Sequence, residues 1–487
     1  MTHFRLIILV AMAATAFAQV QLRVDFSSNL QHWDGFGINY VEVPQTRDYK
    51  SNPQEYGGFS QLYEAQRQEI LDLFFGEDGL KPGVVKMFLD PWHEPVNDNG
   101  DPNVLDAARF DHETTTKWMR YFVREGLRRT RAWGGDLEII TTLYGPPAWM
   151  TKQKFMRGRD IDPAMRAELA EYLAAWVKYL RETEKLPVRY LSLHNEGEDS
   201  NRWPIDGKSA GDPTHDYNAW WTPRQVVEFF KILRPMLDRH GLQSVGITPG
   251  EPTNWDRFFF WGYGPAIAED AEALKILALI TSHGFTGGRD YWYSTHNPRG
   301  VQQLRQLRPE LKAWTTSMTW GRMDVGFVED LAGQIYGVGV NSAIPWAAVQ
   351  TSDWVGGDPN PGTAVRVIES CKCYQVLPGY WFYKQVSRAG QPGMAVAPVS
   401  SPHGAVKLIG FSANGTKHPD AFVVTNNTWE PIAARIAVPG TKASAFAGFR
   451  TGLTMEEKYA TIGETAVRGG ALEYVLPPKS ATTFFAK

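Results

Sequence analysis

The feature that most constrains the fold of this chain is an alternation of short apolar runs with longer stretches of helical periodicity, from about residue 33 to residue 348. Short runs rich in β-branched residues are typical of strands, and helical stretches between them are typical of the crossovers that join parallel strands. Eight strands are expected, at residues 33–41, 84–89, 137–143, 188–193, 244–247, 276–282, 311–316 and 341–347.

Helical periodicity predicts the segments that connect these strands, at residues 61–75, 114–132, 164–183, 223–239, 266–273, 301–307 and 327–337. Seven crossovers between eight strands favour a closed barrel over an open sheet, because no glycine-rich phosphate-binding turn follows the first strand. The predicted fold class is therefore α/β, with a (β/α)8 barrel as its main domain.

The pattern changes after about residue 390, where short alternating strands are separated by Gly, Pro and Asn turns. This pattern predicts an antiparallel β-sandwich beside the barrel. Residues 21–26 alternate in the same way and are expected to add a strand to it. The expected domains are a signal peptide (1–18), an N-terminal strand of the sandwich (19–32), the (β/α)8 barrel (33–371) and the C-terminal β-sandwich (372–487).

The first residues are typical of a cleaved secretory signal. Arg5 precedes an apolar run at residues 6–14, and the small-residue pattern Ala16-Phe17-Ala18 follows it. We therefore expect the mature chain to be secreted, to the extracellular space or the periplasm. Cys371 and Cys373 are the only cysteines, too few for a disulfide framework or a four-ligand metal site, and we expect two nearby buried thiols.

The overall charge excludes some classes of partner. The chain has 50 basic and 53 acidic residues, and no run of Lys and Arg is long enough to follow a nucleic acid backbone. No segment after the N-terminal one has the roughly 18 uninterrupted apolar residues of a membrane span. His93 and His194 lack the second His, four residues on, of helical zinc sites, so neither a metal nor a cofactor is expected. The oligomeric state stays open.

The candidate reactive residues follow the fourth expected strand, since the active sites of α/β barrels lie at the C-terminal ends of their strands. Asn195 and Glu196 stand there side by side. A carboxylic acid at this position can protonate a leaving oxygen, while the neighbouring amide hydrogen-bonds a hydroxyl. From position alone, an ordinary acidic loop is an equally good interpretation.

Aromatic residues make up 13% of the chain and include 18 Trp. Trp and Tyr combine a flat apolar face with a polar edge, which suits the binding of sugar rings. The expected substrate-binding residues lie near the strand ends: Trp92, Tyr144, Trp149, Trp203, His283, Trp320 and Trp346, together with Asn195. For any one Trp a place in the core is the more common alternative, and a single His283 is more often structural.

Several stretches together resemble glycoside hydrolase family 30: residues 33–37 (WDGFG), 145–150 (GPPAWM), 193–197 (LHNEG), 282–285 (SHGF) and 478–484 (PKSATTF). They occur in the order of the family and cover nearly the whole mature chain. The resemblance implies a retaining glycosidase with a barrel and a side β-sandwich built from both chain ends. It also implies that Glu196 is the acid/base and that a nucleophilic Glu follows the seventh strand.

Ser317 stands where this resemblance expects that nucleophilic Glu, and Gly197 replaces a Pro. A serine hydroxyl is uncharged and shorter than a carboxylate, so it does not readily form the glycosyl-enzyme intermediate. Three explanations follow: a replaced nucleophile, natural or engineered; an inverting enzyme whose base is another carboxylate; or a protein that binds sugar without cleaving it. The alternative carboxylates are Glu251, Asp324 and Asp353.

The sequence thus predicts a secreted glycoside hydrolase acting on β-linked glycans or glycosides, with Glu196 and the Ser317 position at its catalytic centre. The expected partner is an oligosaccharide or polysaccharide. The rival hypothesis is a carbohydrate-binding pseudoenzyme. Sugar, linkage and endo or exo action depend on loop contacts of a few kcal/mol and do not follow from the sequence.

Overall fold

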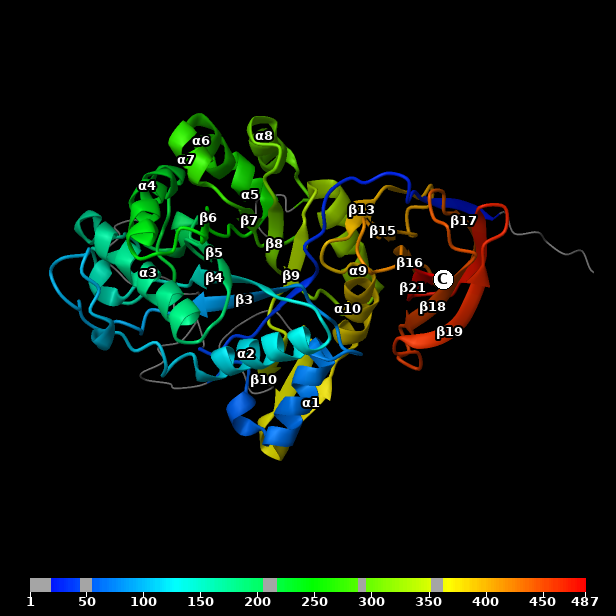
Figure 1. Cartoon of the computed structure of the whole chain (residues 1–487), viewed down its shortest axis with the longest axis horizontal. Coiled ribbons are helices and arrows are strands. Elements are labelled where there is room, and N and C mark those ends of the chain that lie inside the picture. Colours follow the sequence, from blue (N-terminus) through cyan, green and yellow to red (C-terminus); the bar gives the residue numbers. More distant parts are fainter. Residues whose placement is uncertain (1–18, 44–54, 205–216, 288–294, 352–361) are drawn as a thin grey trace, which may run out of the picture.

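The computed structural model describes residues 19–43, 55–204, 217–287, 295–351 and 362–487. The proposed signal segment, residues 1–18, and Asp353 lie outside these ranges. Figure 1 shows two parts side by side, a helix-rich part and a strand-rich part that contains the blue N-terminal strand and the C-terminus.

Parallel strands form the centre of the larger part, in two runs of neighbours, β2 to β6 and β7 to β9. Their bounds are β2 (Gly37–Asn39), β3 (Val84–Leu89), β4 (Glu138–Leu143), β5 (Val188–Ser192), β6 (Gly246–Thr248), β7 (Ile280–Ser282), β8 (Ala313–Met318) and β9 (Ser342–Pro345). The runs join where Ala278 N donates to Ile247 O at 2.9 Å, and at the other side where Ala348 N donates to Asn39 O at 3.2 Å. These contacts close the barrel, which confirms the predicted fold class.

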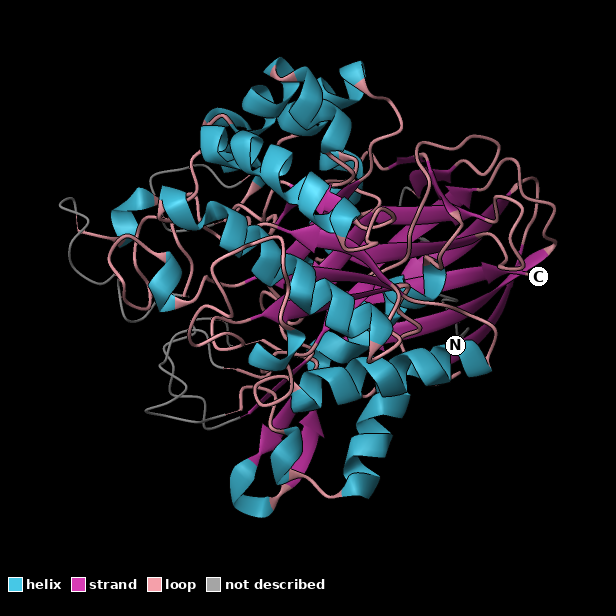
Figure 2. Ribbon diagram, turned by 60° about the vertical axis from the view of Figure 1, so that its left-hand side comes forward, coloured by secondary structure: helices cyan, strands magenta, loops and turns pink. Residues whose placement is uncertain are grey.

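Helices surround the parallel strands, as Figures 1 and 2 show. Local sequence sets their ends: α4, for example, begins after Thr222, whose hydroxyl accepts from Gln225 N, and has Pro223 at its first position. The bounds are α1 (Glu64–Phe75), α2 (Lys117–Ala132), α3 (Arg166–Glu182), α4 (Pro223–Arg239), α5 (Trp255–Phe260), α6 (Tyr263–Glu269), α7 (Ala271–Ile276), α8 (Arg299–Leu307), α9 (Val325–Ala332) and a π-helical turn (Gly333–Val338). The sequence did not predict α5.

Two facing sheets form the smaller part. One has the strand order β14-β1-β17-β20 and the other β13-β15-β16-β21-β18-β19. The bounds are β1 (Val20–Val24), β13 (Ala395–Ala397), β14 (Val399–Ser400), β15 (Leu408–Ser412), β16 (Ala421–Asn426), β17 (Ile432–Ala437), β18 (Ala445–Gly452), β19 (Ala460–Ala466), β20 (Ala471–Leu476) and β21 (Ser480–Ala486). The N-terminal β1 runs parallel to β17 and antiparallel to β14, so both ends of the described chain meet in this β-sandwich.

Helix α10 (Pro378–Ala389) lies between the barrel and the sandwich and was not predicted. It contacts α9 on one side and β21 on the other. Its Tyr380, Phe382 and Tyr383 are all 0% exposed. A helix in this place fills the junction between the two parts with aromatic side chains.

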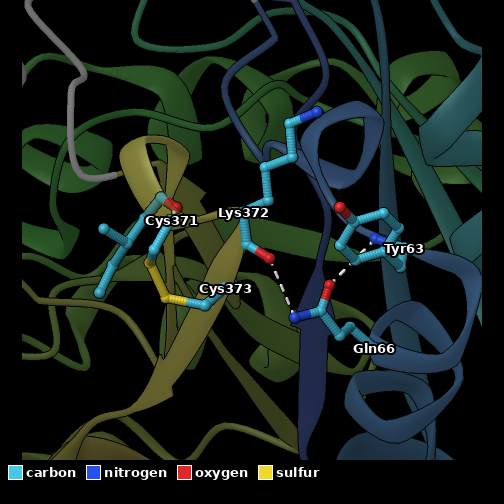
Figure 3. The surroundings of a disulfide bond; sticks show 6 residues. Tyr63, Gln66, Cys371, Lys372 and Cys373 are labelled. Atoms are coloured by element: carbon cyan, nitrogen blue, oxygen red, sulfur yellow. Dashed lines mark hydrogen bonds between the residues drawn. A yellow bond between two sulfur atoms is a disulfide. The ribbon is translucent and has the colours of Figure 1, made fainter.

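Strands β10 (Val349–Thr351), β11 (Val365–Ile368) and β12 (Cys373–Val376) form a small separate sheet. Cys371 and Cys373 form a disulfide at the turn between β11 and β12, which corrects the prediction of two buried thiols. Figure 3 shows this turn beside α1, where Gln66 Nε2 donates to the main-chain oxygen of Lys372 at 3.0 Å. Cys371 is exposed, because the hairpin end projects beyond the barrel wall.

None of the helices within the described residues combines the length and apolar character that crossing a membrane requires.

Candidate active site

The segment that carries Glu196 follows β5 and is fixed by main-chain contacts. Glu196 N donates to Glu251 O at 2.9 Å, and Glu251 N donates to His194 O at 2.9 Å. Asn218 Nδ2 donates to Asn195 O at 2.7 Å and to Glu196 O at 3.0 Å. Glu196 itself has a φ of 46°, in the left-handed region that non-glycine residues rarely adopt. Backbone strain of this kind is common at functional sites, where the surroundings hold it in place.

The carboxylate of Glu196 contacts a guanidinium group and an imidazole ring. Arg202 NH2 lies 2.8 Å from Oε2, and His283 Nδ1 lies 2.8 Å from Oε1. The Glu196 side chain is 14% exposed, whereas that of His283 is 3% exposed. Glu196 is therefore the solvent-facing end of a polar chain that continues inward.

Glu251 is the next carboxylate inward and follows β6, at 0% exposure. It accepts hydrogen bonds from Thr142 Oγ1 at 2.7 Å, from His283 Nε2 at 3.2 Å and from the ammonium group of Lys86. Burial by itself would raise its pKa, but the Lys86 charge and the His283 hydrogen bond outweigh burial and lower the pKa to about 2. Glu251 is thus a permanent anion below the site.

His283 follows β7 and joins the two carboxylates through its two ring nitrogens. Burial opposes its charging, yet the hydrogen bonds to Glu196 and Glu251 raise its pKa above the ordinary histidine value. Because ionised Glu251 can only accept, Nε2 carries a hydrogen. One further proton then lies between His283 Nδ1 and Glu196 Oε1, on either the imidazole or the carboxyl group.

Ser317 lies in β8 at 1% exposure, beside the same lysine. Lys86 Nζ donates to Ser317 Oγ at 3.0 Å and to Thr316 O at 3.2 Å. The counter-ion of this buried lysine is Glu251, at the end of a different strand. The structure thus brings the predicted Glu196, His283 and Ser317 into one hydrogen-bonded network.

The predicted aromatic residues fall into two groups, half-buried and buried. Trp92, Trp149 and Trp346 are half-buried, so part of each ring is accessible. Tyr144 is 2% exposed and Trp203 is 5% exposed. Trp320 is 0% exposed and packs against Phe327 and Tyr383 of α9 and α10, so its ring belongs to the core and not to a stacking surface.

Of the alternative carboxylates, the structure brings only Glu251 into the described part of the site. Asp324 caps α9, where it accepts a hydrogen bond from Gly326 N at 2.8 Å. The sequence analysis did not identify Lys86 and Arg202 as site residues. Lys86 could have been identified, because it is a charged residue in the middle of the apolar run that forms β3, whose six residues are all buried.

The described residues at this site hold no group of three His, Cys, Asp or Glu ligand atoms close enough to share a metal ion. A cavity of about 680 Å³ lies at the opposite end of the barrel. Its walls include Arg189, Gly246 and Ala278, at the N-terminal ends of β5, β6 and β7. It is therefore separate from the network around Glu196.

Solved structures with the same fold align over nearly the whole chain. The catalytic domain of the glycoside hydrolase family 30 xylanase C from Talaromyces cellulolyticus has a TM-score of 0.71 at 17% identity, over 96% of this chain and 100% of that one. A family 30 endoxylanase from Clostridium papyrosolvens C71 has a TM-score of 0.65 at 16% identity, over 96% and 100%.

An endo-β1,6-glucanase has a TM-score of 0.67 at 17% identity, over 97% of this chain and 95% of that one. No protein-family model matches the sequence, and neither does any curated protein. At such low identities these alignments show the fold alone. The chain has the barrel and side β-domain of family 30 enzymes.

Proposed function

We propose that this protein is a glycoside hydrolase that acts on β-linked glycans, with Glu196 as its general acid and base. The observation that carries the proposal is the Glu196–His283–Glu251 chain, in which His283 bridges the buried Glu251 and Glu196, whose side chain is 14% exposed. Structural neighbours that are named as xylanases and as an endo-β1,6-glucanase support β-glycans as the substrate class.

The chemistry follows from the position of the proton between His283 and Glu196. Breaking a glycosidic bond requires protonation of the leaving oxygen, and a carboxylic acid within hydrogen-bond reach supplies it. Glu251 keeps a hydrogen on Nε2 of His283, so Nδ1 faces Glu196 and can return a proton after each turnover. Arg202 holds the second carboxylate oxygen and orients the group.

The second carboxylate of a glycosidase is the open part of the mechanism. Retaining enzymes need it about 5–5.5 Å from the acid, and inverting enzymes about 6.5–9.5 Å away. Ser317 is uncharged, and Glu251 is 0% exposed with its oxygens occupied by three donors. We infer that Glu251 acts through His283 as a positioning residue and does not activate water itself.

A second candidate function, glycan binding without hydrolysis, is favoured by one observation. Lys86 contacts the hydroxyl of Ser317 and has its counter-ion at Glu251, so the lysine is satisfied without a carboxylate at position 317. A barrel with this arrangement is electrostatically balanced as it stands. It needs no nucleophile to be stable.

The test is a panel of soluble β-glycans, including xylan and β1,6-glucan, incubated with the wild-type chain and with Glu196→Gln. Release of reducing ends by the wild type and its loss in the variant would support hydrolysis, and NMR of the first product would give its anomeric configuration. Binding by calorimetry without product would support the second candidate. Neither binding nor turnover on any glycan would refute both.

We also propose that the chain is exported, since polysaccharide substrates lie outside cells and residues 1–18 have the pattern of a secretory signal. N-terminal sequencing of the protein from its natural source tests this, with cleavage before Gln19 as the expected result.

A further inference from the structure

A second cluster of acidic residues lies away from the candidate active site, between the loop that follows β3 and the first half of α3. One carboxylate oxygen from each of Asp98, Glu168 and Glu171 lies within 4.8 Å of the others. Their side chains are buried, with residue exposures of 8%, 7% and 1%. Glu168 and Glu171 are three positions apart on α3, which places both on one face of the helix.

The cluster contains polar atoms that no hydrogen-bond donor reaches. Glu171 is 1% exposed, and its Oε1 has no partner. Glu168 Oε2 has none either. Asn97 donates its amide nitrogen to Glu168, and its own buried Oδ1 has no partner. Unpaired buried oxygens are costly, so several in one place point to a missing positively charged or donating ligand.

The charges around the cluster are of one sign. Glu94 is a fourth carboxylate beside the cluster, since its Oε1 accepts from Asp98 N at 2.9 Å. The Glu168 and Glu171 carboxyl groups lie within hydrogen-bond reach of each other. Within the described residues these four carboxylates form no ion pair with Lys, Arg or His. A bound proton relieves one oxygen at a time, whereas a divalent cation is shared by all of them.

We propose that Asp98, Glu168 and Glu171 bind a calcium ion. All the available ligands are oxygens, which suits a hard cation; zinc sites use mainly His and Cys. Calcium accepts six to eight oxygens in irregular geometry, whereas magnesium requires a near-octahedral arrangement. Such an ion would tie the loop after β3 to the rigid helix α3.

The site has a structural link to Trp149, one of the expected substrate-binding residues. Trp149 Nε1 donates to the main-chain oxygen of Glu94 at 2.9 Å, and Glu94 Oε1 accepts from Asp98 N at 2.9 Å. A cation at Asp98 would therefore steady the loop on which the half-buried Trp149 rests. The same contact places an indole near the ion, which gives the proposal an optical readout.

The experiment uses the full chain, dialysed against a chelator and then titrated with Tb³⁺, followed by competition with Ca²⁺. We expect tryptophan-sensitised terbium emission that saturates at one ion per chain and that Ca²⁺ displaces. Thermal melting should shift upward with Ca²⁺ and much less with Mg²⁺, because only a ligand of the folded state stabilises it.

Two variants localise the ion. Glu171→Gln keeps the shape and removes a ligand charge, so Ca²⁺ affinity should fall about tenfold or more, since even outer-shell changes at metal sites cost that much. Glu182→Gln, on the exposed side of the same helix, should bind like the wild type. If Glu171→Gln does not fold, Asp98→Asn replaces it.

The proposal is overturned if the dialysed wild type shows neither terbium emission nor a calcium heat up to millimolar ion. It is also overturned if Glu171→Gln and Asp98→Asn bind as tightly as the wild type. A cluster that is simply protonated would give a third pattern that refutes the proposal: Glu171→Gln more stable than the wild type, and no response of either protein to Ca²⁺. All readouts are binding or stability, so they stand apart from any test of glycan hydrolysis.

Discussion

The buried pair of Lys86 and Glu251 gives the sharpest prediction about how the site is held together. Both side chains are 0% exposed, so solvent does not screen them. Replacing Lys86 with Met fills similar space but leaves the Glu251 carboxylate without its main counter-charge. Breaking a buried pair by removing one partner typically costs about 3–5 kcal/mol.

The titration of Glu251 gives an independent magnitude. Its pKa is lowered from 4.5 to about 2 in the folded protein. At about 1.4 kcal/mol for each pKa unit, this difference corresponds to roughly 3.5 kcal/mol of stability at neutral pH. This figure lies within the range for a broken buried pair, so we expect Lys86→Met to lower the free energy of unfolding by about 3–4 kcal/mol at pH 7.

The pH dependence follows from the sign of the shift. A carboxyl group whose pKa is lower in the folded state stabilises the fold above its unfolded pKa, here 4.5, and this contribution is lost as the pH falls toward 2. The difference between wild type and Lys86→Met should therefore be largest at pH 7 and smaller at pH 3.5. Denaturant unfolding at the two pH values measures it.

Two further variants complete the cycle. Glu251→Gln removes the charge and keeps the shape, and the double variant removes both partners. If the pair is the cause, the double variant should lose less stability than the two single losses added together. A Lys86→Met protein within about 1 kcal/mol of the wild type at pH 7, or a loss that does not change with pH, would refute the reasoning.

The remaining predictions concern the site and the surface. Glu196→Gln should abolish any glycan hydrolysis with little change in melting temperature, because the proton is removed and the shape is kept; unchanged turnover on an unactivated glycan would contradict it. Ser317→Glu should create or greatly increase β-glycosidase activity with retained configuration, since it adds a carboxylate beside Lys86; product NMR showing rapid inversion by the unmodified protein would exclude a missing nucleophile. Trp320→Ala should cost about 3–5 kcal/mol of stability as a core truncation, whereas Trp149→Ala should mainly weaken glycan binding in calorimetry. If Trp149→Ala lowers stability and Trp320→Ala weakens binding instead, Trp149 is the core residue and Trp320 the binding residue. Replacing both Cys371 and its partner with Ser should cost less than about 2 kcal/mol, because a disulfide that closes so short a loop removes little chain entropy; denaturant unfolding of the double variant measures this.

The sequence predicted most of the barrel because its signals are local. The run at residues 84–89 is apolar and β-branched, and it forms β3 with the same bounds. Thr222 caps α4 and Pro223 is its first residue, so the start of this helix could be predicted from the sequence. Helix α10 was missed because eight of its twelve residues are buried, and these include the polar residues Gln385 and Ser387. Polar residues therefore do not mark its exposed face alone.

The site was predicted only as far as barrel topology allows. The ends of parallel strands meet at one face, so Glu196 and His283 could be expected near each other. Their distances from Glu251 depend on three separate strands and on the buried Lys86, and no local pattern encodes such spacing. Trp320 was placed in the cleft because the covering helix α10 was not foreseen.

The pairing of β1 with β17 has a consequence for the order in which the protein is made. Val20 and Ala434 are opposite each other in neighbouring parallel strands, although more than 400 residues separate them in the sequence. At a synthesis rate of about 5–20 residues per second, roughly 20–80 s pass between the appearance of the first strand and that of its partner. During this interval the barrel segments are synthesised while β1 lacks the sandwich strands that bury Leu22 and Val24. A strand synthesised late, β17, therefore completes the surroundings of the first strand.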